Sequence, residues 1–187
     1  MLAFRRMGTS LVMVAALLLA GAPSLAAAAS AAEIDREATA ALNKLYRQVP
    51  GAKELAKRAK AILIFPSVVK GGLIVGGHYG DGALRKGGKT VGYYNTAAVS
   101  YGLQAGAQTF GYALFFMGEG ALSYLDSSSG WEIGVGPSVV VLDEGMAKTM
   151  TTSTARDDIY AFIFGQRGLM AGLGLQGSKI TRIHPEK

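Results

Sequence analysis

The sequence predicts an α+β fold in which amino-terminal helices pack on a strongly bent, mostly antiparallel, glycine-rich β-sheet. A helical period before residue 61 gives way to short β-rich runs separated by turn residues, and many of the 26 glycines lie inside those runs. The chain has no cysteine. Disulfides and thiolate metal sites therefore contribute nothing to its stability, which must come from packing.

The first 32 residues are typical of a secretory signal peptide. Arg5 and Arg6 precede an apolar run over 11–20 and then Ala- and Ser-rich sequence. The run is shorter than the roughly 20 residues of an ordinary transmembrane helix. We expect 1–32 to be cleaved at one of the small residues between 26 and 32, and 33–187 to form one periplasmic domain, peripheral to a membrane. Removing the two arginines lowers the formal net charge from +6 to +4, because the segment contains no acid.

Two helices are predicted before the sheet. Apolar residues at spacings of three and four predict an amphipathic helix over 34–49, which ends at Pro50-Gly51. A second, short helix is predicted over 52–60, with a narrow apolar side. The apolar positions of the first helix are Ile34, Ala38, Ala41, Leu42, Leu45, Tyr46 and Val49.

Short β-rich runs fill the remainder of the chain. Lys86-Gly87-Gly88-Lys89 joins two of them as a hairpin, and 117–125 has room for a single helical turn. The predicted strands are 61–65, 72–79, 82–85, 90–95, 98–104, 112–117, 131–142, 159–164, 169–176 and 179–183.

Glycine inside these strands has two interpretations. It contributes no side chain and costs conformational entropy, so repeated use predicts bulges, sharp bends or close backbone approach in a tightly curved sheet. Alternatively, glycines at alternate positions form a flat floor for another element or an acyl chain. The pairs Gly134/Gly136 and Gly172/Gly174 have this spacing.

No catalytic or nucleotide-binding motif is found. The segment "GGLIVGGHYGDG" matches neither the dinucleotide fingerprint nor the P-loop, since its interior is strand-like and no helix pattern follows. His78 and His184 are isolated, with no carboxylate at metal-ligand spacing. The adjacent acids Asp157-Asp158 and Asp143-Glu144 face opposite ways on a strand. We expect a non-enzymatic protein without metal or cofactor; an unrecognised hydrolase is the alternative that dispersed active-site partners leave open.

Basic residues cluster after the first helix. Each cation near an anionic membrane contributes on the order of 1 kcal/mol, so several together hold a protein reversibly at a lipid surface. The alternative is a solvated helix face on which Glu54 pairs with Arg58 or Lys57. Nucleic acid is not expected, because a secreted protein rarely meets it. The predicted lipid-binding residues are Lys53, Lys57, Arg58, Lys60 and Lys70; Arg85, Lys86 and Lys89 form a further basic hairpin tip.

Four ordered blocks resemble the bacterial SYLF-domain family over residues 52–183. The first, "AKRAKAILIFPSVVKGGLIVGGHYGDGAL", is similar to the family's short helix, apolar strand, Val-x-Lys-x-Gly step and glycine-rich strand. The others are "VSYGLQAGAQTFGYALFFM", "GWEIGVGPSVVV" and "DDIYAFIFGQRGLMAGLGLQGSKI". The closing block of the family commonly carries an acid where this chain has Gln176.

The resemblance implies lipid binding without catalysis. It places the lysine of the family's opening block on Lys70, and the basic amphipathic start on Lys53, Lys57, Arg58 and Lys60. Actin, which yeast members bind, is not an expected partner of an envelope protein. We therefore predict a phospholipid-binding module of the bacterial cell envelope, with an envelope scaffold or stress protein that binds another protein as the alternative.

Overall fold

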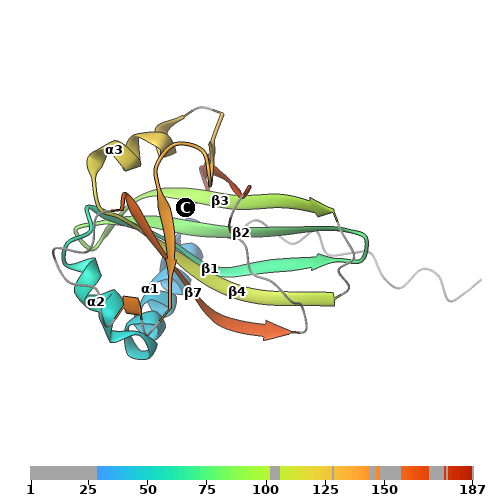
Figure 1. The fold of residues 1–187 in the computed structure, drawn as a ribbon, viewed down its shortest axis with the longest axis horizontal. Helices are drawn as coiled ribbons and strands as arrows, with labels where there is room; N and C mark the ends of the chain where they lie inside the picture. The colour runs from blue at the N-terminus through green and yellow to red at the C-terminus, as the bar shows by residue number, and fades with distance from the viewer. Residues whose placement is uncertain are drawn as a thin grey trace, which may run out of the picture.

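The computed structural model describes residues 29–101, 106–127, 129–143, 146–147, 157–168, 175 and 177–186. It has the α+β architecture predicted from the sequence: helices at the amino-terminal side pack on a strongly curled, mostly antiparallel sheet of eight strands (Figure 1). The strand order is β5-β8-β3-β2-β1-β4-β7-β6. The strands are β1 (Ala61–Gly72), β2 (Val75–Lys86), β3 (Lys89–Tyr101), β4 (Gly106–Phe116), β5 (Trp131–Glu132), β6 (Val139–Leu142), β7 (Ile159–Gly168) and β8 (Lys179–Ile183).

Helix α1 (Ala31–Gln48) lies on one face of the sheet through the apolar side that its sequence period predicts. Helix α2 (Pro50–Ala56) begins and ends earlier than the predicted range 52–60. The reason for the early start is that proline is tolerated in the first turn of a helix, where its missing N–H has no intrahelical partner, so Pro50 starts α2 as well as ending α1. The buried residues of the two helices are Ile34, Ala38, Ala41, Leu45, Ala52 and Leu55.

The start of α1 is tied to the fold by residues that precede Glu33. The Ser30 hydroxyl accepts a hydrogen bond from the Glu33 N–H at 3.3 Å, and the Ala31 N–H donates to the Glu186 carbonyl at 2.8 Å. Ala29 packs against the apolar cluster beneath the helix. Because these contacts satisfy helix-terminal N–H groups and join the two ends of the described chain, they stabilise the fold.

We therefore predict that a chain beginning at Glu33 is less stable than a chain beginning at Ala29. Loss of the Ser30 cap alone is worth about 1 kcal/mol. Urea denaturation of the two chains measures the difference. Equal free energies of unfolding would show that residues 29–32 contribute nothing to stability.

Long strands replace several of the predicted short runs. β2 joins the predicted runs 72–79 and 82–85, and β3 joins 90–95 with the described part of 98–104. Their interior glycines and polar residues pair with neighbouring strands rather than ending them. β1 also continues past Pro66, because a register shift between Phe65 and Val68 places the proline in a β-bulge, where its missing N–H is tolerated.

The predicted strand 131–142 is wrong. Its ends form β5 and β6, which lie at opposite edges of the sheet, and residues 133–138 connect them. β6 is parallel to β7, whereas the other pairs are antiparallel. The turn-forming Gly134 and Gly136, both at positive φ, explain the break. The predicted strand 169–176 and the position of Gln176 lie outside the described residues, except for Leu175.

Other local predictions are confirmed. β8 has the predicted bounds, and Lys86 pairs with Lys89 across the Gly87-Gly88 turn. The predicted helical turn within 117–125 is α3 (Glu119–Leu122), followed by a 3-10 turn, η1 (Ser123–Asp126).

The two faces of the sheet bury separate apolar clusters. Ile62 and Ile64 of β1 pack toward α1 and α2, whereas Leu63 and Phe65 pack toward α3, η1 and Trp131. This alternation is the period of two expected for a strand that is covered on both sides. Figure 1 shows α1 and α2 on one side of the sheet and α3 on the other, all near the same end of the strands. The opposite end, where β1 turns into β2, extends beyond the helices.

Candidate functional site

Four of the five predicted lipid-binding residues lie together. Lys53 and Lys57 belong to α2 and its carboxyl cap, and Arg58 and Lys60 follow within the connection to β1; all four are exposed. Lys70 is half-buried near the far end of β1. At about 3.3 Å per residue it lies roughly 30 Å from Lys60. The structure therefore brings together the cations of the α2 end and separates Lys70 from them.

A pocket of about 330 Å³ opens between α2, α1 and the β2–β3 hairpin. We call it the α2 pocket. Three cations line it, two of which the sequence predicted, and most of the other lining side chains are apolar. The lining residues are Leu42, Tyr46, Ala56, Lys57, Ala59, Lys60, Ala61, Ile62, Arg85, Gly87 and Gly88.

Arg85 is held at this pocket by α1. Its Nη2 donates to the Asp35 carbonyl at 2.9 Å and to the Thr39 hydroxyl at 2.8 Å, and it lies 3.6 Å from the Asp35 carboxylate. Asp35 is itself fixed, because its carboxylate accepts hydrogen bonds from Thr90 and Tyr93 of β3. The Nε atom of Arg85 is buried and has no hydrogen-bond partner. The guanidinium is thus fixed in place, with its charge paired to the Asp35 carboxylate.

Lys57 and Lys60 are exposed residues whose side chains line the α2 pocket. The Lys57 Nζ lies 2.7 Å from the Glu54 carboxylate, but both side chains are more than half exposed, so this ion pair holds the lysine only weakly. Lys60 is fixed at its backbone, where its N–H donates to the Phe116 carbonyl at 2.8 Å. Burial raises the pKa of Tyr46 to about 12, so the Tyr46 hydroxyl stays neutral at physiological pH.

Lys53 and Arg58 belong to the same basic cluster but do not line the pocket. Lys53 precedes Lys57 by four residues, a spacing that places the two on one helix face. Lys86 is directed elsewhere, since its Nζ lies 3.3 Å from the Glu119 carboxylate of α3. Of the basic residues at the β2–β3 hairpin tip, Arg85 lines the α2 pocket, and Lys86 and Lys89 do not.

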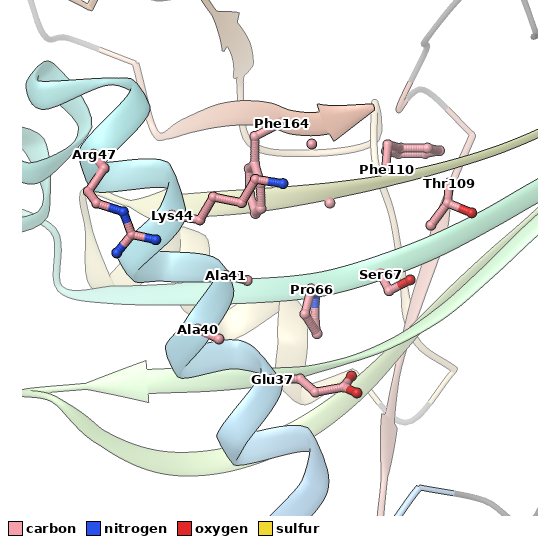
Figure 2. Close-up of a pocket in the computed structure, with 12 residues that line it drawn as sticks. Glu37, Ala40, Ala41, Lys44, Arg47, Pro66, Ser67, Thr109, Phe110 and Phe164 are labelled. Atoms are coloured by element: carbon pink, nitrogen blue, oxygen red, sulfur yellow. The ribbon is translucent and has the colours of Figure 1, made fainter. Parts of the chain in front are cut away.

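A second pocket, of about 450 Å³, lies along the other side of α1 (Figure 2). We call it the α1 pocket. Figure 2 shows Lys44 reaching from α1 over Phe164, with Glu37 farther along the helix beside Pro66. Its glycines have a packing role: a Cβ on Gly111 would meet the Phe164 ring at 2.6 Å. Lys44 and Arg47 bring two cations to the α1 pocket and Glu37 brings one carboxylate, whereas the lining of the α2 pocket has three cations and no carboxylate. The α2 pocket is therefore the more favourable anion site.

Lys70 lies beside His78, its partner across β1 and β2. Burial lowers the pKa of His78, and the Lys70 charge lowers it further. His78 therefore stays neutral at physiological pH and adds no cation to this part of the sheet. Its ring lies edge-on to Phe110, with 6.4 Å between ring centroids.

The lowered pKa of His78 predicts a pH-dependent stability. The unfolded chain binds the proton near pH 6.5, before the folded chain does, so the free energy of unfolding falls as the pH drops below about 6.5. His78→Phe keeps a ring against Phe110 and removes this contribution. Urea denaturation at about pH 7.5 and about pH 5.5 should show a larger loss in the wild type than in the variant. Equal losses would contradict the assignment.

Within the described ranges, no group of three or more His, Cys, Asp or Glu side chains has the arrangement of a metal site. The helices of this part of the chain include none that is long and apolar enough to cross a membrane. No protein-family model matches the sequence, and a search of curated proteins finds no match.

Sequence reasoning missed Arg85 as a partner of Lys57 and Lys60. The basic hairpin tip was recognisable, but its proximity to α2 depends on how β2 and β3 fold back beside β1. The half-buried Asp35 was also missed, since on a helical pattern it is one of several polar residues between apolar ones. Leu42 and Tyr46 were recognisable as apolar positions of the first helix, though not as the wall of a pocket.

Proposed function

We propose that the protein binds anionic phospholipids at a membrane surface of the bacterial envelope, without catalysis, and that the α2 pocket receives the headgroup. The observation that carries this proposal is the combination, in one pocket, of three cations with an apolar wall. Lys57, Lys60 and Arg85 offer donors to a phosphate, whereas Leu42, Ile62 and their neighbours offer contact to the adjoining glycerol and acyl carbons.

The size of the α2 pocket favours binding of a lipid headgroup at the membrane surface over extraction of the whole lipid from the bilayer. Small-molecule sites span roughly 300–1,000 Å³, and the α2 pocket, at about 330 Å³, is at the lower limit. A diacyl phospholipid is larger than such a volume, so its acyl chains remain in the bilayer while the headgroup is bound. The resemblance to SYLF-domain proteins, whose members bind lipid, favours the same ligand class.

Liposome flotation tests the proposal. The protein should float with vesicles that contain phosphatidylglycerol and stay in the soluble fraction with phosphatidylcholine alone, because the cations require an anionic surface. Added salt should release it by screening. Failure to float with either lipid, together with capture of one protein at fixed stoichiometry, would overturn the proposal in favour of an envelope scaffold.

A further inference from the structure

The β1–β2 hairpin ends in a turn whose chemistry is unusual. Two-residue connections between antiparallel strands favour Asn-Gly, Asp-Gly or Gly-Gly, as at Gly87-Gly88 in this same sheet. The β1–β2 connection is one residue longer, because Gly72 pairs with Gly76, and its residues Leu73, Ile74 and Val75 include none of the usual turn formers Gly, Asn and Asp. These three residues are 69%, 66% and 56% exposed. Large apolar side chains at a protruding tip neither favour the turn conformation nor pack into a core, so their presence there indicates a function.

The apolar surface continues from this turn onto the face of the sheet that α1 leaves open. Val75, Val99, Val69 and Tyr79 are all more than half exposed. The registers place them on one face: Val69 is opposite Tyr79, and Val99 is opposite Gly77, which is opposite Gly71. We call the turn and these four residues the apolar tip. Figure 1 shows the hairpin at the end of the sheet farthest from α2.

Along the strands, the exposed residues nearest the turn are apolar, and cationic and aromatic residues follow farther from it. At about 3.3 Å per residue, Val99 lies about 7 Å behind the turn, Lys70 about 10 Å, and Tyr79 about 13 Å. Arg167 lies at the level of Tyr79, because Thr109 pairs with both Val69 and Arg167. Interfacial segments bury their apolar side chains to a depth of roughly 5–10 Å, with aromatic and cationic side chains at the headgroups. The turn and Val99 lie within this depth, whereas Val69 lies at the level of Tyr79 and Arg167, where headgroups are expected.

The charges at this end of the sheet complement an anionic surface. Within the described residues of β1, β2, β3, β4 and β7, Asp81 is the one carboxylate. It accepts a hydrogen bond from the Tyr79 hydroxyl at 2.7 Å and lies more than about 20 Å along β2 from the turn. Lys70 and Arg167 are nearer to the tip.

We propose that the apolar tip inserts into the outer part of an anionic bilayer and anchors the protein there. This inference relies on the proposed function for the ligand class and adds a second, separate contact. The turn lies about 35 Å along β1 from Ile62 in the α2 pocket, so one lipid cannot contact both. Membrane association therefore has an apolar anchor at one end of the sheet and a headgroup site at the other.

The test uses the folded protein without the apolar leader of residues 1–28, vesicles of phosphatidylglycerol and phosphatidylcholine, and two tip variants. Leu73→Ser/Ile74→Ser and Leu73→Asp/Ile74→Asp should each weaken vesicle association at least tenfold. Because both side chains are exposed, thermal stability should change little, which circular dichroism checks. Val135→Asp/Val141→Asp is the matched control, since both residues are exposed valines outside the tip and outside the lining of the α2 pocket; its association should equal that of the wild type.

Insertion depth is read from a tryptophan introduced at the tip. In Leu73→Trp, brominated acyl chains should quench the new emission, whereas the native Trp131 is 3% exposed and should be unaffected. A tryptophan at the exposed position 141, in Val141→Trp, should not be quenched. Three outcomes would contradict the proposal that the tip inserts into the bilayer. The tip variants could associate with vesicles as strongly as the wild type, or the indole in Leu73→Trp could remain unquenched. The third is a tip variant that loses only self-association, measured by light scattering.

Soluble dihexanoyl phosphatidylglycerol, below its micelle concentration, separates this inference from the proposed function. Tip variants should bind it as the wild type does, because the α2 pocket is unchanged. If the wild type does not bind the soluble lipid but inserts its tip into vesicles, the proposed headgroup site in the α2 pocket is wrong and the proposed membrane anchor is supported.

Discussion

Lys57→Gln/Lys60→Gln should weaken association with phosphatidylglycerol vesicles about 30-fold, because two cations at an anionic surface contribute about 1 kcal/mol each. The two residues are exposed and lie outside the buried clusters, so the fold should be retained. The same variant should lose most of its affinity for soluble dihexanoyl phosphatidylglycerol. Vesicle flotation and titration calorimetry measure the two losses.

Lys179→Gln/Arg182→Gln is the control for that experiment. It removes the same net charge from exposed positions on β8, away from the α2 pocket. An equal loss of binding in this variant would show that only the overall charge matters. Lys44→Gln/Arg47→Gln removes the cations of the α1 pocket instead, and a larger effect there would assign the headgroup to that site.

Gly82→Ala should lower the free energy of unfolding by about 2–3 kcal/mol, as expected for overpacking a rigid core. A Cβ at this position would collide with the Ile64 carbonyl oxygen of β1 and lie 2.7 Å from the Phe65 ring. The carbonyl belongs to a neighbouring strand and cannot move without disturbing the sheet. Urea denaturation measures the loss.

Gly71→Ala is the matched glycine for this comparison. It lies in the open part of the same sheet, where the nearest atom to an added Cβ is the Gly106 carbonyl oxygen at 3.8 Å. Its backbone φ is not positive. We expect unchanged stability or a gain of up to about 1 kcal/mol, since alanine restricts the unfolded chain. Similar losses at Gly71 and Gly82 would contradict the packing explanation.

The two interpretations of glycine apply to different parts of the sheet. Gly82 and Gly111 leave room for neighbouring backbone or rings, as the curved-sheet interpretation predicts. Gly71 instead lies among the exposed apolar residues of the open face, where an added Cβ would meet no atom closer than 3.8 Å. The sequence alone could not separate these cases, because a glycine's environment depends on which strand it pairs with.

Features of the site that depend on neighbouring residues were predictable from the sequence, whereas features that depend on strand pairing were not. The spacing of Ile34, Ala38 and Leu45 predicted the face by which α1 packs, because helix period is local. A β-rich run that ends at residue 65 predicts Lys70 close to Lys57. The bulge at Pro66 lets β1 continue and carries Lys70 to the far end of the sheet. Arg85 joins the pocket through strand register, which short-range patterns do not determine.

Nuclear magnetic resonance titration with dihexanoyl phosphatidylglycerol tests the central claim most directly. We predict amide shift changes concentrated in residues 56–62 and 85–88 and in the adjoining turn of α1 around Tyr46, with little change in β8. Shifts that cluster elsewhere on the sheet, or none at ligand concentrations that saturate vesicle binding, would contradict the assignment of the α2 pocket as the lipid-headgroup site.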